Sequence, residues 1–168
     1  MNREPIKILG DIIKEFMVLT DQQIMIYNQN FKLPQTSGLF VILQYNTSKV
    51  YSAKNQFIPA PEGDAGGQES ITTLTQEGYT INIISRDDEA RQRKEEVILS
   101  LNTNFAQDQQ ELYQFKIAQI SNSFRNVSEL EGAAMINRFA IDISLLARYE
   151  IIRDVEYYDS FTNTITTD

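Results

Sequence analysis

The sequence contains no cysteine, no histidine and no tryptophan among its 168 residues. Without cysteine the chain has no disulfides and no thiol nucleophile, and without histidine it lacks the side chain most often used for acid–base catalysis. Zinc sites built from these two residue types are excluded for the same reason. The chemistry open to this chain is therefore that of carboxylates, hydroxyls and amines.

Long hydrophobic runs are also missing. No stretch approaches the roughly 18 consecutive apolar residues that indicate a membrane span. The first five residues, Met-Asn-Arg-Glu-Pro, carry no hydrophobic segment of the signal-peptide kind. We therefore expect a soluble protein that is made in the cytoplasm and has no membrane partner.

The charge balance is acidic, with 23 acidic against 15 basic residues and a formal net charge of -8. Repulsion from phosphate groups disfavours unspecific binding to DNA or to anionic membranes. Apolar residues make up 42% of the chain, which is enough to fill one hydrophobic core. We expect one domain over residues 1–168.

Residues 136–158 carry the clearest pattern in the chain, because apolar side chains recur there at every second position. One parity, apolar apart from Arg153, comprises Phe139, Ile141, Ile143, Leu145, Ala147, Tyr149, Ile151, Arg153, Val155 and Tyr157. The other parity is mostly charged or polar. This alternation predicts a β-strand with one apolar face.

The predicted strand is too long for one small domain. At about 3.3 Å per residue it extends about 75 Å, whereas a usual strand has about five or six residues. Part of it is therefore expected to overhang the domain, where bare apolar strand must either bend back or bind a partner. We interpret residues 136–158 as an assembly element.

The side chains expected to matter most lie at the exposed end of this strand, since aromatic residues there are typical interface anchors. The alternative is that they close the core of their own subunit. The subunit-interface candidates are Tyr149, Ile151, Val155, Tyr157, Tyr158 and Phe161. Asp87 and Arg91, four apart on a charged helix, are further candidates, and the alternative for them is a solvated helix face.

The remaining apolar patterns predict the other elements of the fold. Residues 5–19 form an amphipathic helix, residues 23–27 a short strand, and residues 39–45 a central strand buried on both faces. Residues 69–84 alternate as a second long strand, antiparallel to the first, with a bulge at Gly78.

A second amphipathic helix follows with Ser85 or Asp87 as its cap, and residues 115–120 alternate again as a strand. Residues 128–134 are expected to form one helical turn. The fold class is thus α/β (α+β), with a mixed, largely antiparallel sheet of about 4–5 strands, two main flanking helices and long extending strands.

Two polar segments are expected outside these elements. Residues 59–67, rich in Pro and Gly, predict a mobile loop. This loop either projects onto a partner or into a central opening, or it is only a solvated hairpin tip. Residues 160–168 form a polar tail.

No catalytic, cofactor or metal site is predicted. The strand-to-helix junction at residues 83–89 carries acids where a phosphate needs backbone amides and lysine. A metal-dependent nuclease site could draw on Asp87, Asp88, Lys94 and Glu95. However, Asp87 and Lys94 lie about 10 Å apart along a helix with a rise of 1.5 Å per residue. A carboxylate-dependent, metal-assisted hydrolase of unknown substrate remains the alternative function.

Six segments spread over most of the chain carry a family resemblance. They are IYNQNF at 26–31, GLFVI at 38–42, YTINIISRD at 79–87, RKEEV at 93–97, LEGAA at 130–134 and YYDSF at 157–161. In their order and spacing they resemble the neck or tail-terminator (head–tail joining) proteins of tailed bacteriophages. The resemblance rests on no catalytic motif.

The resemblance implies a structural virion protein that forms a homo-oligomeric ring, usually a hexamer, between tail and head. Its partners would be other copies of itself, the tail tube protein, the head connector or head-completion protein, and the sheath protein where the tail is contractile. Genomic DNA would pass through without specific binding. The resemblance implies assembly in the host cytoplasm, a final place in the virion, no enzyme activity and no cofactor.

Overall fold

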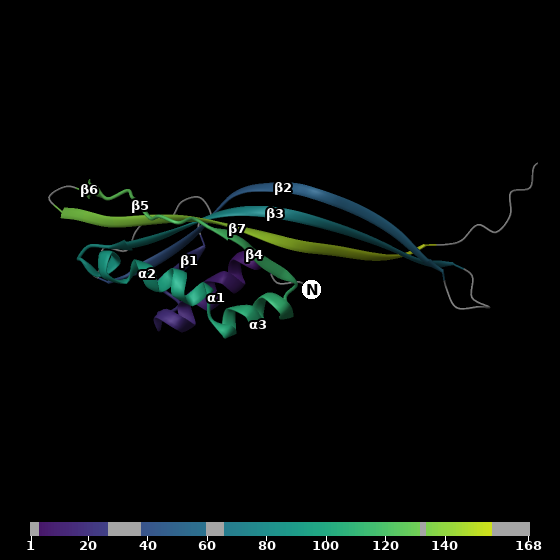
Figure 1. Cartoon of the computed structure of the whole chain (residues 1–168), viewed down its shortest axis with the longest axis horizontal. Coiled ribbons are helices and arrows are strands. Elements are labelled where there is room, and N and C mark those ends of the chain that lie inside the picture. Colours follow the sequence, from purple (N-terminus) through teal and green to yellow (C-terminus); the bar gives the residue numbers. More distant parts are fainter. Residues whose placement is uncertain (1–3, 27–37, 60–65, 132–133, 156–168) are drawn as a thin grey trace, which may run out of the picture.

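The long C-terminal strand organises the fold. In the computed structural model, which describes residues 4–26, 38–59, 66–131 and 134–155, this strand is β7 (Ala134–Val155). β3 (Gly67–Ser85) pairs with it antiparallel, from Ser85 opposite Asn137 to Gly67 opposite Val155. β2 (Phe40–Pro59) pairs antiparallel with β3 on its other side. The three strands form one long ribbon (Figure 1).

The shorter strands lie at one end of this ribbon. β1 (Ile24–Ile26) runs parallel to the start of β2, and β4 (Phe115–Ile120) pairs antiparallel with β7. β5 (Arg125–Asn126) and β6 (Glu129–Glu131) pair with the first part of β7. The strand order is β1-β2-β3-β7-β4, so the predicted mixed, largely antiparallel sheet of an α+β fold is confirmed.

The helical turn expected at residues 128–134 is wrong. Part of that segment is β6, and Glu129 lies opposite Ile136 of β7. A strand replaces the turn because β7 offers an unpaired edge beside it, and tertiary pairing overrides the weak helical preference of so short a segment.

All three helices cover one face of the sheet (Figure 1). α1 (Pro5–Met17) and α2 (Glu89–Leu101) were predicted from their apolar stripes. α3 (Asn104–Leu112) was not predicted as a helix. It begins at Thr103, whose hydroxyl accepts a hydrogen bond from the amide of Ala106 at 3.1 Å. In the described part of the chain, no helix is long and apolar enough to cross a membrane.

The core lies between these helices and the odd-numbered face of β3 and β7. Its most deeply buried side chains are Ile8, Leu9, Ile12, Ile13, Val41, Leu43, Ile81, Ile83, Ile141 and Leu145. Each such burial stabilises the fold by about 1.5–3 kcal/mol. On the other face a small second cluster contains Ile42, Ile84 and Ile136. The start of β2 is therefore buried on both faces, as predicted.

The bulge expected at Gly78 lies on the neighbouring strand instead. Tyr45 of β2 faces Tyr79, and Thr47 faces Gly78, so Asn46 is the extra residue. A side chain at Gly78 would place its Cβ 2.7 Å from Oγ1 of Thr47. Glycine thus leaves room for the hydroxyl of Thr47 on β2, and it does not mark a bulge in β3.

The predicted loop at residues 59–67 is strand at its two end residues. Pro59 is the last residue of β2 and Gly67 the first of β3, while residues 60–65 lie outside the described part of the chain. The predicted polar tail at residues 160–168 also lies outside it.

Candidate assembly surface

The candidate functional site is the half of the ribbon that continues past the helices (Figure 1). We call it the arm and define it as residues 46–59 of β2, 67–77 of β3 and 148–155 of β7. Its strands pair with one another out to Pro59 opposite Gly67 and Gly67 opposite Val155. The overhang predicted from the length of β7 therefore exists, as three paired strands rather than one bare strand.

The helix-side face of the arm carries uncovered apolar side chains. This face continues the odd-numbered face of β3 and β7 that the helices bury elsewhere. Val50 is 59% exposed and Phe57 is 45% exposed, and both lie opposite odd-numbered residues of β3. Ile151, 60% exposed, lies directly opposite Ile71. Together they form an apolar strip across all three strands, which Glu69 interrupts on the same face, where it accepts from Asn55 and pairs with Arg153.

The opposite face of the arm is more polar and is hollowed. The hollow has a volume of about 420 Å³. It is lined by Ser52, Lys54, Gln56, Ile58, Ser70, Thr72, Leu74, Arg148 and Glu150. Glu150 accepts a hydrogen bond from the hydroxyl of Ser70 at 2.7 Å, so polar contacts between neighbouring strands fix this face.

A carboxylate and two tyrosines mark the junction of arm and body. Glu77 is only 7% exposed. The hydroxyl of Tyr149 donates to its Oε1 at 2.6 Å, and the hydroxyl of Tyr79 donates to its Oε2. The ring of Tyr45 packs edge-on against that of Tyr79, with centroids 5.6 Å apart. The buried charge is thus held by hydroxyl donors on two neighbouring strands.

The buried setting beside Glu77 raises the pKa values of both tyrosines. Burial, and then the hydrogen bond to Glu77, raises the pKa of Tyr79 well above its ordinary value. The same two causes, in the same order, raise the pKa of Tyr149. Both phenols therefore stay protonated, and remain hydrogen-bond donors, at neutral pH.

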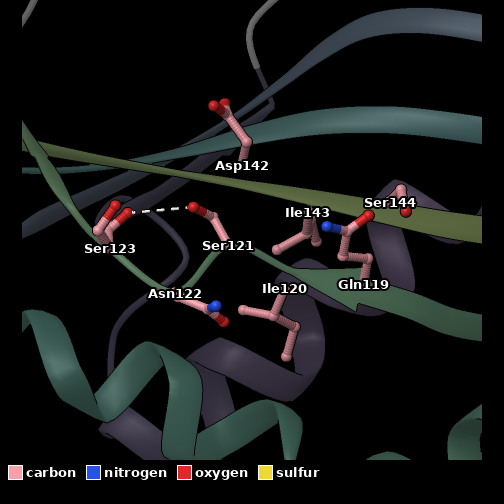
Figure 2. Close-up of a pocket in the computed structure, with 8 residues that line it drawn as sticks. All are labelled: Gln119, Ile120, Ser121, Asn122, Ser123, Asp142, Ile143 and Ser144. Carbon is pink, nitrogen blue, oxygen red and sulfur yellow. Dashed lines mark hydrogen bonds between the residues drawn. The ribbon is translucent and has the colours of Figure 1, made fainter.

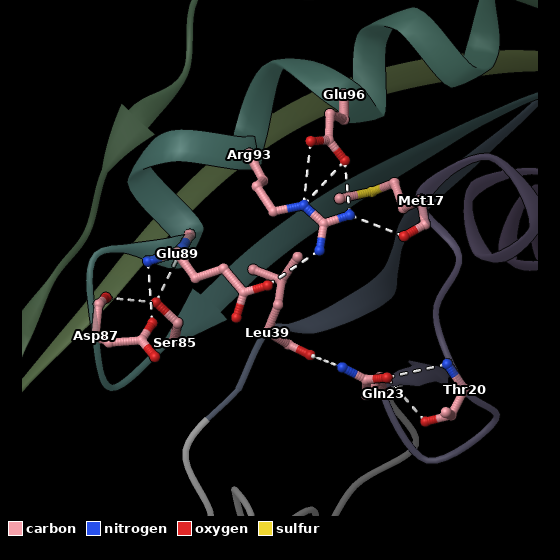
Figure 3. A network of polar contacts seen from close by, with 10 residues as sticks. Met17, Thr20, Gln23, Leu39, Ser85, Asp87, Glu89, Arg93 and Glu96 are labelled. Atoms are coloured by element: carbon pink, nitrogen blue, oxygen red, sulfur yellow. Dashed lines mark hydrogen bonds and ion pairs between the residues drawn. The ribbon is translucent and has the colours of Figure 1, made fainter.

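At the far end of the body, Arg93 of α2 joins two helices (Figure 3). Its guanidinium donates to Glu89 at 3.0 Å, to Glu96 at 2.8 Å and to the backbone oxygen of Met17 at 2.8 Å. Hydrogen bonding to Glu96 is the main cause that raises the pKa of Arg93. The pair between Glu89 and Arg93 is therefore part of the packing of α2 against α1.

The N-cap of α2 is Asp88 rather than the predicted Ser85 or Asp87, although both of these accept hydrogen bonds from amides of the first turn. The hydroxyl of Ser85 accepts from the amide of Ala90 at 2.9 Å, and the carboxylate of Asp87 accepts from the amide of Glu89 at 3.0 Å. Asp87 and Arg91 are both exposed. They lie by the end of β3 that is opposite to the arm, so the structure does not bring them together with the candidates on β7.

The candidates on β7 divide into two groups. Ile151 is exposed on the arm, Val155 is half-buried at its tip, and Tyr149 is 37% exposed with its hydroxyl bound to Glu77. Tyr157, Tyr158 and Phe161 lie outside the described residues.

A second hollow, of about 500 Å³, lies in the body at the end of β4, between Gln119 and Ser144 (Figure 2). Its one carboxylate, Asp142, accepts two hydrogen bonds from Arg125, at 3.0 and 2.9 Å, and one from Thr80. The described residues contain no group of three acidic side chains that could hold a metal ion. Of the acids considered for a nuclease site, Glu95 pairs with Lys94, which lowers its pKa.

Comparison with known proteins leaves the chain without a family assignment. No protein-family model matches it, and no curated protein sequence matches it either.

Sequence reasoning missed the part of the surface that β2 supplies. Val50, Tyr51, Phe57 and Ile58 lie in a segment that is polar overall, and two bulges, at Asn46 and Tyr51, shift its two-residue alternation. The available signal was indirect, because a strand as long as residues 69–84 leaves a long unpaired edge unless a second long strand pairs with it. Glu77 was also missed, because its parity also carries Glu69, Thr73 and Thr75 and so does not single it out.

Proposed function

We propose that this chain is a structural subunit of the phage neck, a ring-forming tail terminator that caps the tail tube and joins it to the head connector. The observation that carries the proposal is the arm, which extends an apolar sheet face beyond the helices that cover it elsewhere. An exposed apolar strip on a long, paired ribbon is suited to a subunit contact. The ring and its place in the virion are inferred from the resemblance of the sequence to neck and tail-terminator proteins.

The charge distribution supports contact between copies. The arm carries four basic residues, Lys49, Lys54, Arg148 and Arg153, and four acidic ones, Glu69, Glu77, Glu150 and Asp154. It is therefore neutral, whereas the whole chain carries -8. A neutral arm can approach the acidic body of a neighbour without the repulsion that two bodies would experience.

The body offers apolar side chains that could receive an arm. On the helices, Phe16 and Leu112 are exposed, and Val18 follows α1 with its side chain in solvent. A contact between the arm of one copy and the helices of the next joins two different surfaces, and such a heterologous contact closes into a ring by rotation. If the rotation did not close, the same contact would build an open filament.

The proposal is tested by mixing the purified protein with tail tubes and imaging the tube ends in negative stain. We expect rings of about six subunits on the ends. Val50→Asp, which places a charge in the apolar strip, should reduce capped ends by about tenfold or more. Ser52→Asp adds the same charge on the opposite face of the arm and should cap like the unmodified protein. Tube ends that stay bare at high concentrations of the unmodified protein would contradict the proposal.

A further inference from the structure

The residue that ends α1 has an unusual backbone conformation for its type. Val18 has a φ of 54° and a ψ of 48°, which is the left-handed helical region. Side chains branched at Cβ are poorly suited to this region, because Cβ there comes too close to the following carbonyl oxygen. Among the described residues other than glycine, only Val18 and Gln114 have a positive φ. Val18 is therefore a strained position.

The fold requires this backbone conformation but not this side chain. The amide of Val18 donates to the carbonyl of Glu15 at 3.3 Å, and the amide of Leu19 donates to that of Lys14 at 2.9 Å. This is a Schellman turn, in which the left-handed residue is usually glycine and sometimes asparagine. It turns the chain so that Leu19 is buried. Glycine at position 18 would make the same turn without strain.

The side chain of Val18 contributes little to its own subunit. It is 88% exposed, the highest value among the large apolar side chains of the described residues. Phe16, two positions earlier, is 43% exposed. A valine that is both strained and in solvent lowers the stability of the free subunit, and a contact outside the subunit would offset that loss.

The charged side chains around this end of α1 are mostly acidic. Arg93 donates to the carbonyl of Met17, the residue before Val18 (Figure 3). The charged residues that lie within four positions of Val18 or pair with Arg93 are the bases Lys14 and Arg93 and the acids Glu15, Asp21, Glu89 and Glu96. The side chain of Asp21 is 90% exposed even though Lys14 binds it. The surface beside Val18 therefore carries an excess of negative charge.

The apolar strip of the arm offers the matching charge. Arg153 lies on the same face as Ile151, two positions further along β7. Its side chain is 62% exposed, whereas that of Glu69, 4.0 Å away, is 25% exposed. The charge that this face presents to a partner is therefore mainly positive. The strip and the end of α1 are complementary in both apolar character and charge.

We propose that Val18, with Phe16 beside it, is the point on the body where the apolar strip of a neighbouring copy docks. The inference rests on the proposed ring function and deepens it, because it assigns both surfaces of the contact between subunits. The arm lies at one end of the molecule, whereas Arg93 and the end of α1 lie at the far end of the body. The contact therefore joins two different surfaces, as the closing of a ring requires.

The absence of cysteine allows the contact to be mapped with single-cysteine variants of the full-length chain. A mixture of Val18→Cys and Ile151→Cys, treated with a short bismaleimide, should form a covalent dimer at least about tenfold faster than a mixture of Val18→Cys and Ser52→Cys. Ser52 is the matched control because it lies on the opposite, hollowed face of the arm. Equal rates in the two mixtures, or Val18→Cys linked to itself as the main product, would overturn the proposal.

A second test separates the side chain of Val18 from its backbone. Val18→Gly relieves the strain and should raise the Tm by about 2–4 °C. The same variant should weaken self-association in sedimentation velocity, and the capping of tube ends, by about tenfold. Val18→Leu keeps an apolar side chain and should assemble like the unmodified protein. A Val18→Gly variant that assembles as well as the unmodified protein would count decisively against the docking point.

Gln114→Gly is the control for relief of strain. Gln114 also has a φ of 54°, and its amide donates to the carbonyl of Glu111 at 3.4 Å in the turn after α3. This variant should raise the Tm in the same direction and leave assembly unchanged. An equal loss of assembly in Gln114→Gly and Val18→Gly would show that the change in strain, rather than the missing side chain, weakens the contact, and the proposal would be wrong.

Failure of this inference is separable from failure of the proposed function. If the unmodified protein and Val18→Gly cap tube ends equally well, the docking point is wrong and the neck function stands. If the protein never caps tubes but Val18→Cys and Ile151→Cys cross-link as expected, the contact between copies is supported and the neck function is contradicted.

Discussion

At the scale of single residues, Tyr149 shows both what a pattern can indicate and what it cannot. The alternation of residues 136–158 places this side chain on the apolar parity at the boundary of the overhang, and the structure leaves it 37% exposed there. Its hydroxyl, however, is held by Glu77, which is 72 positions away in the sequence. No local pattern identifies such a partner, because the contact depends on the register between β3 and β7.

The hydrogen bond of Tyr149 should contribute measurably to stability. Tyr149→Phe removes one of the donors to a buried carboxylate, and we expect it to lower the free energy of unfolding by about 1–3 kcal/mol. Urea denaturation measures the effect. Tyr51→Phe is the matched control, since that hydroxyl binds Gln76 at an exposed position and should matter by less than about 0.5 kcal/mol. Equal losses in the two variants would contradict the role assigned to Glu77.

The raised pKa values of Tyr79 and Tyr149 predict sensitivity to alkali. Above the ordinary tyrosine pKa of 10.0 the unfolded chain loses these protons, while the folded chain retains them. The stabilising contribution is therefore intact below pH 10 and declines as pH rises above it. Urea midpoints at pH 8 and pH 11 should differ more for the unmodified protein than for a variant with both tyrosines changed to Phe. An equal decline would refute this origin.

Arg93 and Arg91 provide a second matched pair on one helix. Arg93→Ala removes the bonds to Glu89, Glu96 and the carbonyl of Met17, and we expect a loss of about 1–2 kcal/mol in thermal or urea unfolding. Arg91 is exposed, and Arg91→Ala should change stability by less than about 0.5 kcal/mol. A larger effect at Arg91 than at Arg93 would contradict the helix packing described above.

At the scale of elements, periodicity alone located α1, α2, β1, β3, β4 and β7, because each shows one clear apolar stripe or alternation. It did not extend β2 over residues 46–57, where bulges shift the alternation and most side chains are polar. This stretch is a strand because β3 supplies a partner along its whole length. α3 was missed for a related reason, since Ala106 is its only fully buried side chain.

The tip of the arm depends on a close contact between two strands. A Cβ on Gly67 would lie 2.7 Å from the backbone oxygen of Ile58 and 2.4 Å from the ring of Phe57. Gly67→Val should therefore separate the ends of β2 and β3, at a cost of about 1–3 kcal/mol. Hydrogen exchange at residues 55–59 should accelerate by about tenfold or more, while exchange in α1 stays unchanged.

The control for the arm tip is Lys54→Ala, an exposed change on the same strand that should leave this exchange unaltered. Unchanged exchange at residues 55–59 in Gly67→Val would show that the tip does not rely on the contact with Phe57 and Ile58.

At the scale of the whole molecule, the chain divides into a body that buries its apolar surface and an arm that does not. The length of β7 predicted the overhang, and the physical reason is that side chains beyond the helices have no covering layer. The sequence did not predict that the overhang would be a ribbon of three paired strands. That outcome depends on pairing between segments far apart in the chain, which length and parity do not specify.

The most direct test of the account is the mass of the assembly that the full-length protein forms on tail-tube ends, measured by scanning-transmission electron microscopy of mass per ring. The account predicts closed rings of about six subunits for the unmodified protein and loss of those rings for Val50→Asp. A protein that remains monomeric and never binds the tube, or that assembles equally well with a charge in the apolar strip, would contradict it.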